Sequence, residues 1–378
     1  MKVVNICLTG SYNLGWGYQD NLLSKYQNKN GNEVTLITTQ FINDKNSEEY
    51  LETDCGVFND NGVKVIRLRN GFNTTMTKIL RHYKGLYEIL KEEKPDFIFI
   101  HGLQFLDIFY VCKYLNKNPK VRCSVDGHAD YSNSAQSFAA KVLHKTIWKY
   151  CAKKISKYAT TFYGVLPLRC DFLHEMYHIP SEKIKLLIMG ADDELLNEGA
   201  NAREKTRKEL GISSDDLLII TGGKIDYHKQ ETLVLMDAIN HRNDNMKLAI
   251  FGSVANEMQS EFNKKMSDKI INLGWLSQND IYKYICASDF GFFPGRHSVI
   301  WEQMVAAGIP CAFKDIENTH HVDIGGNCIF LKGSSEIAIK ETLDYISDKD
   351  NYEKMLKAAN NYKKDDFLYS EIAKKSLE

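Results

Sequence analysis

The segment at residues 221–239 reads TGGKIDYHKQETLVLMDAI, the end of a strand followed by two glycines and the start of a helix. Glycine lets the backbone approach a ligand closely, and the amides and dipole of a helix N-terminus favour anions. Lys224 and Lys229, five residues apart, would add point charges for phosphate oxygens. The segment therefore predicts a diphosphate site at Gly223, Lys224 and Lys229, with solvated lysines as the alternative.

A second segment, residues 288–310, reads SDFGFFPGRHSVIWEQMVAAGIP and also leads from a strand into a helix. Ser298 is expected to cap that helix, so that the amides of Ser298 and Val299 face a phosphate. Glu302 would lie about one turn into the helix, where acids bind ribose hydroxyls in other nucleotide sites. A charge stabilised by solvent or by the helix dipole is the alternative interpretation of Glu302.

Short apolar runs alternate with helical patterns along the rest of the chain. These runs are KVVNICL, EVTLITT, VKVIRL, DFIFIHG, VRCSVDG, TTFYGV, DLLIITGG, MKLAIFG, IINLGW and FGFFPG. Alternation of this kind predicts parallel sheets built from right-handed βαβ units. Because several runs are apolar throughout, helices should cover both faces of each sheet. The predicted class is α/β, with doubly wound, Rossmann-like domains.

At 378 residues the chain suits two domains. A polar segment at residues 188–215 predicts the boundary, and a cleft is expected there. The predicted divisions are an N-terminal domain at 1–190, a C-terminal domain at 191–355, and a C-terminal helical segment at 356–378 that returns to the first domain.

Composition indicates an ordinary globular protein, with 43% hydrophobic and 26% charged residues. The strand-like N-terminus and the lack of an apolar run of about 20 residues predict a cytoplasmic protein. Nine cysteines without a C-x-x-C pair make disulfides and zinc unexpected. Residues 1–190 carry 25 Lys and Arg against 18 Asp and Glu, whereas the remainder carries 23 against 31. We therefore expect the first half to face an anionic partner, and no nucleic acid is predicted.

The first predicted strand leads into TGSYNLGWGYQDNL, residues 9–22, in which Gly10, Gly15 and Gly17 permit close approach to a ligand. The glycine spacing does not match the dinucleotide fingerprint, and no ribose-binding acid follows about 20 residues later. NAD is therefore not expected. A plain glycine turn is the alternative.

The segment SVDGHADYSNS, residues 124–134, follows another predicted strand and carries Asp126, His128 and Asp130. A neutral imidazole can bind sugar hydroxyls or transfer a proton, and a nearby carboxylate would fix its tautomer. His128 is therefore a candidate catalytic residue. A helix cap combined with a turn is the alternative.

Together, these motifs and their order resemble the retaining GT-B glycosyltransferases of family 4, over nearly the whole chain. The counterparts of the family motifs are Gly15-Trp16-Gly17, His128, Lys224 with Lys229, and Glu302 with Ala306-Ala307-Gly308-Ile309-Pro310. The resemblance implies two Rossmann-like domains that face each other across a cleft, with residues 1–190 as the acceptor-binding domain and residues 191–355 as the nucleotide-sugar donor-binding domain.

The resemblance also implies roles for individual residues. Lys224 and Lys229 would bind and stabilise the leaving diphosphate, Glu302 the ribose, and the amides of Ser298 and Val299 a phosphate or the sugar. Trp275 and Leu276 would flank the base, and His128 would contact the sugar near its anomeric carbon. Gly15 and Gly17 would close over the diphosphate or the acceptor. The family needs no metal or cofactor beyond the nucleotide sugar and uses front-face attack. The expected donor is a UDP-sugar.

One motif departs from the family pattern. Eight residues before Glu302, where the family has its first glutamate, this chain has Pro294. Arg296 and His297 occupy the region that touches the donor sugar in the family, so we expect them to take over that contact. Arg296 would suit an acidic sugar, although arginine pairs equally well with phosphate.

The segment KVLHKTIWKYCAKKISKY, residues 141–158, interleaves six lysines with apolar residues and Trp148. This pattern predicts an interfacial helix that docks on anionic lipid at the inner face of the membrane. A helix that packs its apolar stripe on the sheet and leaves its lysines in solvent is the alternative.

The sequence thus predicts a retaining hexosyltransferase that moves a sugar to a saccharide or lipid-linked saccharide in polysaccharide, capsule or glycan synthesis. Two alternatives share the fold: a nucleotide-sugar epimerase, and an inactive donor-binding scaffold that lost catalysis with the first glutamate.

Overall fold

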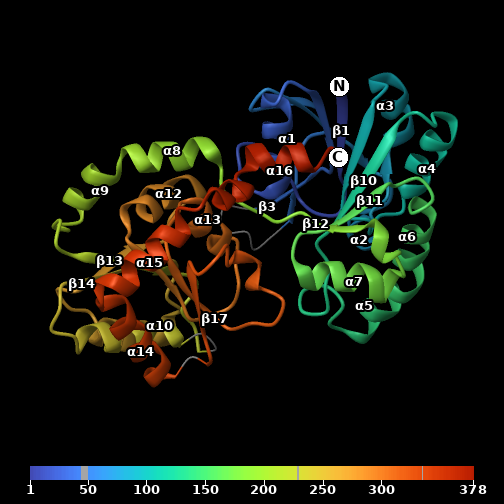
Figure 1. Ribbon diagram of the computed structural model, residues 1–378. Helices are drawn as coiled ribbons and strands as arrows, with labels where there is room; N and C mark the ends of the chain where they lie inside the picture. The colour runs from blue at the N-terminus through green and yellow to red at the C-terminus, as the bar shows by residue number, and fades with distance from the viewer. Residues whose placement is uncertain (44–49, 228–229, 334) are drawn as a thin grey trace. The chain divides into compact units, whose positions relative to one another are not determined.

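The protein consists of two compact units in the computed structural model, which describes residues 1–43, 50–227, 230–333 and 335–378. The first unit comprises residues 1–189 and 369–378, and the second comprises residues 190–368 (Figure 1). The chain therefore passes from one unit to the other at residue 190 and returns at residue 369. The expected return began earlier, at residue 356, so residues 356–368 lie in the second unit.

The sheet of the first unit has eight strands, all parallel except for the antiparallel pair β5–β6. In spatial order the strands are β12 (Ile184–Leu186), β11 (Thr161–Gly164), β10 (Arg122–Gly127), β9 (Phe97–His101), β1 (Lys2–Cys7), β2 (Glu33–Thr38), β6 (Val63–Arg67) and β5 (Gly56–Asp60). Two short antiparallel ribbons accompany the sheet: β3 (Phe41–Asn43) with β4 (Tyr50–Glu52), and β7 (Arg69–Asn70) with β8 (Tyr83–Lys84).

Helices cover both faces of this sheet. Side chains alternate between the faces of a strand, and accordingly Val3 and Val4 belong to two different buried clusters. The helices of this unit are α1 (Gln19–Lys29), α2 (Thr74–Leu80), α3 (Leu86–Glu93), α4 (Ile108–Lys117), α5 (Phe138–Leu143), α6 (Lys149–Ile155), α7 (Pro167–Tyr177) and α16 (Tyr369–Lys375).

The last helix, α16, packs beside α1 although the two are distant in sequence (Figure 1). The rings of Tyr26 and Tyr369 stack with centroids 6.4 Å apart. Gln27 Nε2 donates to Ser376 Oγ at 2.9 Å, and both side chains are fully buried. The C-terminal residues thus complete the core of the first unit.

The predicted interfacial helix is part of a longer helix in which a π-helical turn, His144–Trp148, joins α5 to α6. Trp148 is 2% exposed and lies in the core with Cys151 and Ile155. Trp148 therefore follows the alternative interpretation, in which the apolar stripe of the helix packs inward, and contact of this helix with lipid stays a prediction. Among the helices of the described residues, none has the length and apolar character needed to cross a membrane.

The sheet of the second unit has six strands, all parallel. In spatial order they are β15 (Ile270–Gly274), β14 (Met246–Phe251), β13 (Leu217–Gly222), β16 (Phe290–Phe293), β17 (Cys311–Lys314) and β18 (Cys328–Leu331). The helices are α8 (Asp193–Asn201), α9 (Arg203–Glu209), α10 (Glu231–Asn240), α11 (Gln259–Lys264), α12 (Gln278–Ala287), α13 (Ile300–Ala306), α14 (Glu336–Ser347) and α15 (Lys349–Ala359). All ten predicted strands are present, and the doubly wound α/β class is confirmed.

Candidate functional site

The strand order of the second sheet reverses between β13 and β16, because β14 and β15 lie on one side of this pair and β17 and β18 on the other. Ligands of open α/β sheets bind outside the carboxyl ends of the strands at such a point. β13 ends at Gly222 and β16 ends at Phe293. The two quoted segments, 221–239 and 288–310, therefore bring their loops to the same edge of the sheet.

Glycines set the path of the loop after β13. Gly223 has a φ of +132°, and a Cβ on Gly252 would lie 2.1 Å from the Gly223 carbonyl oxygen. The next residue, Lys224, is exposed, and Ile225 is buried with its amide bonded to the Ser253 carbonyl at 2.8 Å. Hydrogen bonds of the neighbouring Gly223 and Ile225 amides therefore hold the backbone on both sides of the exposed Lys224. Lys229 lies outside the described residues.

The loop after β16 exposes its polar residues. Arg296 and Ser298 are exposed, whereas Pro294 is buried. Val299, rather than Ser298, is the cap of α13, and it makes no side-chain capping bond. The expectation for Ser298 is corrected because α13 begins at Ile300, and the Ser298 carbonyl accepts the Trp301 amide, three residues on, in a tight turn before the helix, at 3.0 Å. Within the described part of the chain, no hydrogen bond is made by the amides of Ser298 and Val299.

Glu302, in the first turn of α13, is fully buried between two histidines. Its Oε1 lies 2.9 Å from His297 Nε2 and 2.8 Å from His321 Nε2. Burial opposes the charge of this carboxylate, but the two imidazoles outweigh burial and lower the pKa of Glu302 to about 2. His321, in the short turn His320–Val322 after β17, was not among the predicted site residues.

Trp275 and Leu276 follow the end of β15 at the same edge of the sheet. Trp275 is 71% exposed, so a flat ligand can reach its indole ring. One strand, β14, separates β15 from β13. Trp275 and Leu276 therefore lie at the same carboxyl edge of the sheet as Lys224, but further from the point where the strand order reverses.

In the first unit, Asp60 holds the glycine-rich loop between β1 and α1, which contains Gly15 and Gly17. Asp60 Oδ2 accepts the Tyr12 hydroxyl at 2.7 Å, and Oδ1 accepts the Gly15 amide at 3.0 Å. Burial, together with Asp60, raises the pKa of Tyr12. The Gly15 amide is therefore bonded within the protein, and Asp60, at the end of β5, holds the loop in place. The sequence did not indicate this role of Asp60.

His128 directly follows β10, and its side chain lies next to the buried Asp126. Asp126 Oδ2 lies 3.2 Å from His128 Nε2 and 3.0 Å from His101 Nδ1, and its Oδ1 accepts the Gly102 amide at 2.9 Å. Burial opposes ionisation of Asp126, but the two histidines outweigh it and lower its pKa. His101 is also buried, yet Asp126 and Asp20 raise its pKa. The side chain of His128 is 37% exposed and is the accessible member of the group.

Strand order reverses in this sheet between β1 and β9. His101 ends β9, and Asp20 lies in the first turn of α1, so both flank this point. Neither was predicted as a site residue. A histidine that ends an apolar strand just before a glycine, as in DFIFIHG, is the sequence signal that could have indicated His101.

Three groups of side chains among the described residues have ligand atoms within 4.8 Å of one another. They are Cys7–Asp20–His101, His101–Asp126–His128 and His297–Glu302–His321. Imidazole and carboxylate ligands suit transition metals, but direct imidazole–carboxylate contacts already account for the last two groups. Metal-independent chemistry stays a prediction.

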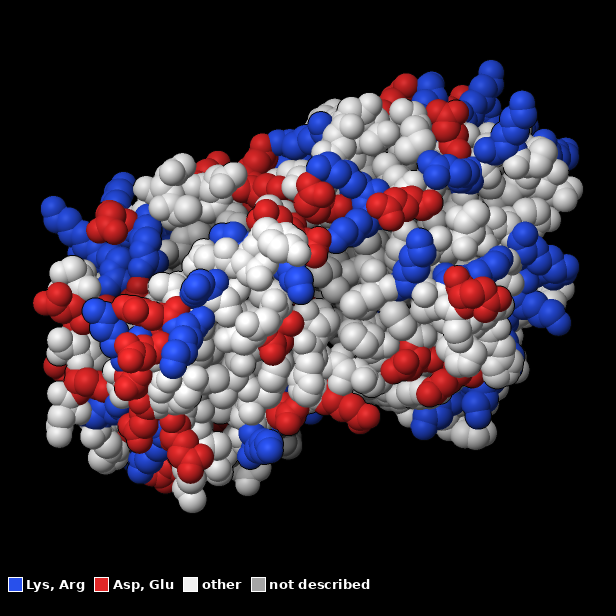
Figure 2. All heavy atoms as spheres, in the orientation of Figure 1, with Lys and Arg blue, Asp and Glu red and all other residues white. Residues whose placement is uncertain are grey.

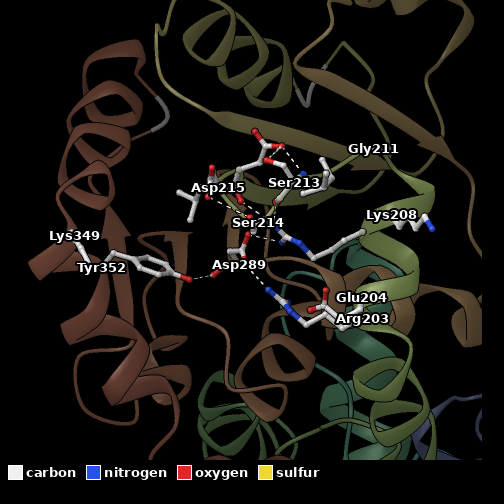
Figure 3. Close-up of a pocket in the computed structure, with 14 residues that line it drawn as sticks. Arg203, Glu204, Lys208, Gly211, Ser213, Ser214, Asp215, Asp289, Lys349 and Tyr352 are labelled. Atoms are coloured by element: carbon white, nitrogen blue, oxygen red, sulfur yellow. Dashed lines mark hydrogen bonds and ion pairs between the residues drawn. The ribbon is translucent and has the colours of Figure 1, made fainter.

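A cavity of about 1030 Å³ lies in the second unit, lined by residues near the start of β13 and β16 (Figure 3). Asp289 there accepts hydrogen bonds from Arg203, from Arg207 at 2.8 Å and from the Leu218 amide at 2.8 Å. Arg207 also donates to the carbonyls of Ala287, Ser213 and Asp216. These contacts bind α9 to the sheet at its amino edge, opposite the candidate site, so we interpret the cluster as structural.

No family model matches the sequence. Among curated proteins, the chain is similar to an Escherichia coli UDP-Gal:alpha-D-GlcNAc-diphosphoundecaprenol alpha-1,3-galactosyltransferase. The two are 24% identical over an alignment of 273 residues, which covers 68% of this chain and 65% of that protein. The match therefore spans less than two thirds of the length of that relative.

Solved structures similar to this one include sucrose-phosphate synthase from Thermosynechococcus elongatus, with a TM-score of 0.68, 13% identity and coverage of 99% of this chain and 96% of that one. They also include a UDP-GlcNAc 2-epimerase from Neisseria meningitidis bound to UDP-GlcNAc, with a TM-score of 0.60, 14% identity and coverage of 99% and 98%. At such identities these likenesses show the fold alone. The protein has the GT-B fold of two Rossmann-like domains, as predicted.

Proposed function

We propose that this protein is a retaining glycosyltransferase that moves a hexose from a UDP-sugar to a saccharide or lipid-linked saccharide acceptor. One observation carries the proposal: Lys224 and the loop 294–299 lie at the carboxyl edge of the second sheet, where its strand order reverses. The resemblance to family 4 implies that the donor diphosphate binds at this edge.

UDP is the proposed nucleotide. The curated relative is a UDP-Gal-dependent transferase by name, and one structure with the same fold is bound to UDP-GlcNAc. No further cofactor is proposed, because a lysine and backbone amides can stabilise a leaving diphosphate without a metal. Lys224 would do so together with Lys229, while His128 would contact the transferred sugar and Trp275 and Leu276 would flank the base.

A thermal-shift panel of nucleotide sugars tests the donor site. A ligand at 100 times its dissociation constant stabilises a protein by about 2.7 kcal/mol, so UDP-sugars should raise the melting temperature. Lys224→Ala should weaken that shift, whereas Lys205→Ala, a change of an 81% exposed lysine on α9, should not. The donor site would be refuted by a panel in which no nucleotide shifts the melting temperature.

Product analysis separates the transferase from its alternatives. Transfer to an acceptor with the donor's anomeric configuration, read by NMR, supports a retaining transferase. Interconversion of the donor without an acceptor would instead indicate an epimerase, which shares this fold. Nucleotide binding without either reaction would indicate an inactive scaffold.

Arg296 is proposed to select the donor sugar. Its side chain is exposed in the loop that replaces the family's first glutamate. A guanidinium pairs well with a carboxylate, so an acidic sugar would suit this position. Turnover with neutral and uronic donors should shift toward the neutral donor in Arg296→Ala, and an unchanged preference would reject the idea.

Peripheral contact with the inner face of a membrane is proposed for the helix that contains α5 and α6. Phe138 is 84% exposed, and Val142 and Tyr150 are also exposed. Exposed lysines at 141 and 145 follow the same helix, and Lys and Arg gather along the α4 and α6 side of the unit (Figure 2). Basic residues beside exposed apolar ones suit an anionic lipid surface.

Flotation with vesicles that contain anionic lipid tests this contact. Replacement of Lys141, Lys145, Lys149 and Lys153 by glutamine should reduce flotation, and added salt should reduce it as well. Phe138→Ser should act in the same direction, because it removes an exposed apolar anchor. Equal flotation of the wild type and the lysine variant would contradict docking through this helix.

A further inference from the structure

The cluster of His297, Glu302 and His321 combines side chains from three places in the fold. Glu302 comes from α13, His297 from the loop after β16, and His321 from the turn after β17. β16 and β17 are neighbours in the sheet, so the cluster lies at its carboxyl edge. The side chains of His297 and His321 are 11% and 7% exposed, and that of Glu302 is not exposed at all.

The carboxylate of Glu302 is turned inward. Both histidines contact the same oxygen, Oε1, at hydrogen-bond distance, and this oxygen has two lone pairs to offer. The other oxygen, Oε2, is buried and has no partner among the described residues. A ribose could therefore reach this carboxylate only if the histidines moved aside.

His297 is the member of the cluster that can face a ligand. Its ring is fixed by an edge contact with Trp301, whose indole stacks on Phe313. With Nε2 directed at Glu302, Nδ1 is the remaining polar atom, and no described residue bonds to it. In the same loop, the exposed Arg296 precedes His297, and the unbonded amides of Ser298 and Val299 follow it.

An imidazole held in this way suits an anion. With a proton on each ring nitrogen, it donates from Nε2 to the carboxylate and from Nδ1 to a phosphate oxygen. A hydrogen bond between charged partners is roughly twice as strong as one between neutral partners.

We propose that His297, Glu302 and His321 form a diphosphate-binding element, in which His297 contacts a phosphate oxygen and Glu302 is a positioning residue rather than a ribose ligand. His321 occupies the second lone pair of Glu302 Oε1 and so fixes the carboxylate toward His297. This inference rests on the proposed function, because it assumes that a nucleoside diphosphate binds at this edge.

The test measures the dissociation constants of UDP, 2′,3′-dideoxy-UDP and uridine by calorimetry with the full chain. Glu302→Gln keeps an acceptor oxygen but removes the charge, so it should weaken UDP and dideoxy-UDP equally, about tenfold for the loss of one charge-assisted bond. The affinity for uridine, which lacks phosphate, should not change.

Two further variants keep the test decisive if Glu302→Gln folds poorly. His297→Gln should give the same pattern, and the double variant should lose no more than either single variant, because Glu302 acts through His297. His321→Asn should weaken UDP binding in the same direction. His320→Asn is the matched control: its side chain is 54% exposed and pairs with Asp315, so UDP affinity should stay as in the wild type.

The outcomes distinguish this inference from the function on which it rests. If Glu302→Gln weakens uridine and UDP but not dideoxy-UDP, Glu302 binds the ribose and the inference is overturned alone. If the losses in the double variant simply add, Glu302 does not act through His297, which also overturns it. If the wild type binds no nucleoside diphosphate, the proposed function and the inference fall together.

Discussion

Asp126 has no contact with solvent, and it remains ionised because two imidazoles and the Gly102 amide surround it. A buried carboxylate without such partners would take up a proton. The same arrangement orients His128, the accessible imidazole. The residue proposed to contact the sugar is thus positioned by a charge that the core of the first unit holds in place.

Asp126→Asn should destabilise the protein by about 3 kcal/mol near pH 6, because it leaves His101 without its buried counter-ion. The pKa of Asp126 is lowered, so its contribution is present above about pH 4 and is lost as the pH falls through the lowered value. The pKa of His101 is raised, so its contribution is complete below about pH 6.5 and is lost as the pH rises through the raised value.

Melting temperatures of the wild type and Asp126→Asn between pH 4 and pH 9 measure this window. The gap between the two proteins should be largest at about pH 4 to 6.5 and smaller at pH 9. Asp268→Asn, a change of an exposed aspartate, serves as the control. A gap that does not depend on pH would contradict the coupling between Asp126 and His101.

Arg207 belongs to the structural cluster around Asp289 at the opposite edge of the second sheet. Its guanidinium donates to Asp289 and to three carbonyls, which an ammonium group cannot reach together. Arg207→Lys should therefore cost stability on the order of 2 kcal/mol in spite of the conserved charge. Thermal unfolding against Lys208→Arg, a change at an exposed neighbour on α9, checks this, and equal stability of the two variants would argue against a structural role.

Single residues were predictable where they directly follow a strand. The sequence placed Lys224 and His128 just after strands, and the structure has both at a carboxyl edge, because a parallel sheet brings the ends of its strands together. Their roles stay predictions. Asp60 and His321 were missed, since each acts on a partner that is distant in sequence, Gly15 and Glu302 respectively. Nothing in the local sequence of either residue indicates that contact.

At the scale of elements, α16 depends on its place in the core of the first unit. Tyr369, Ile372 and Ala373 are buried against α1 and the sheet. Ile372→Asp would bury a charge without a partner and should destabilise the first unit by several kcal/mol. Lys374→Asp changes an exposed residue of the same helix and is the control. Melting curves that coincide for the two variants would contradict the packing of α16.

Strand length did not decide which strands were predictable, because β11 and β16, with four residues each, were predicted and the equally short β17 and β18 were not. The ten predicted runs reappear as strands because burial on both faces requires continuous apolar sequence. β17 and β18, with four residues each, escaped prediction because they lie between loops and contain cysteine and phenylalanine in place of a clear β-branched run. The π-helical turn 144–148 was missed as well, since the lysine spacing of the segment also fits an uninterrupted helix.

At the scale of the whole molecule, the second unit is one continuous segment, 190–368, whereas the first is built from two, 1–189 and 369–378. This asymmetry has a consequence for folding. The second unit can form as soon as its own residues are available, but the first can complete its core only when the last ten residues dock. Multidomain proteins often unfold in more than one step, so the two units can be followed separately.

Fragments of the chain test this dependence. Residues 190–368 alone should unfold cooperatively, whereas residues 1–189 alone should melt at a lower temperature than the same fragment with 369–378 attached through a flexible linker. The expected cause is the exposure of buried apolar residues of α1, such as Leu22 and Tyr26, when α16 is absent. A linked fragment that carries Ile372→Asp should behave like residues 1–189 alone. Equal melting temperatures for residues 1–189 with and without the linked helix would show that α16 is not needed to complete the first unit. The packing of residues 369–378 would then contribute nothing to the free energy of unfolding of that unit.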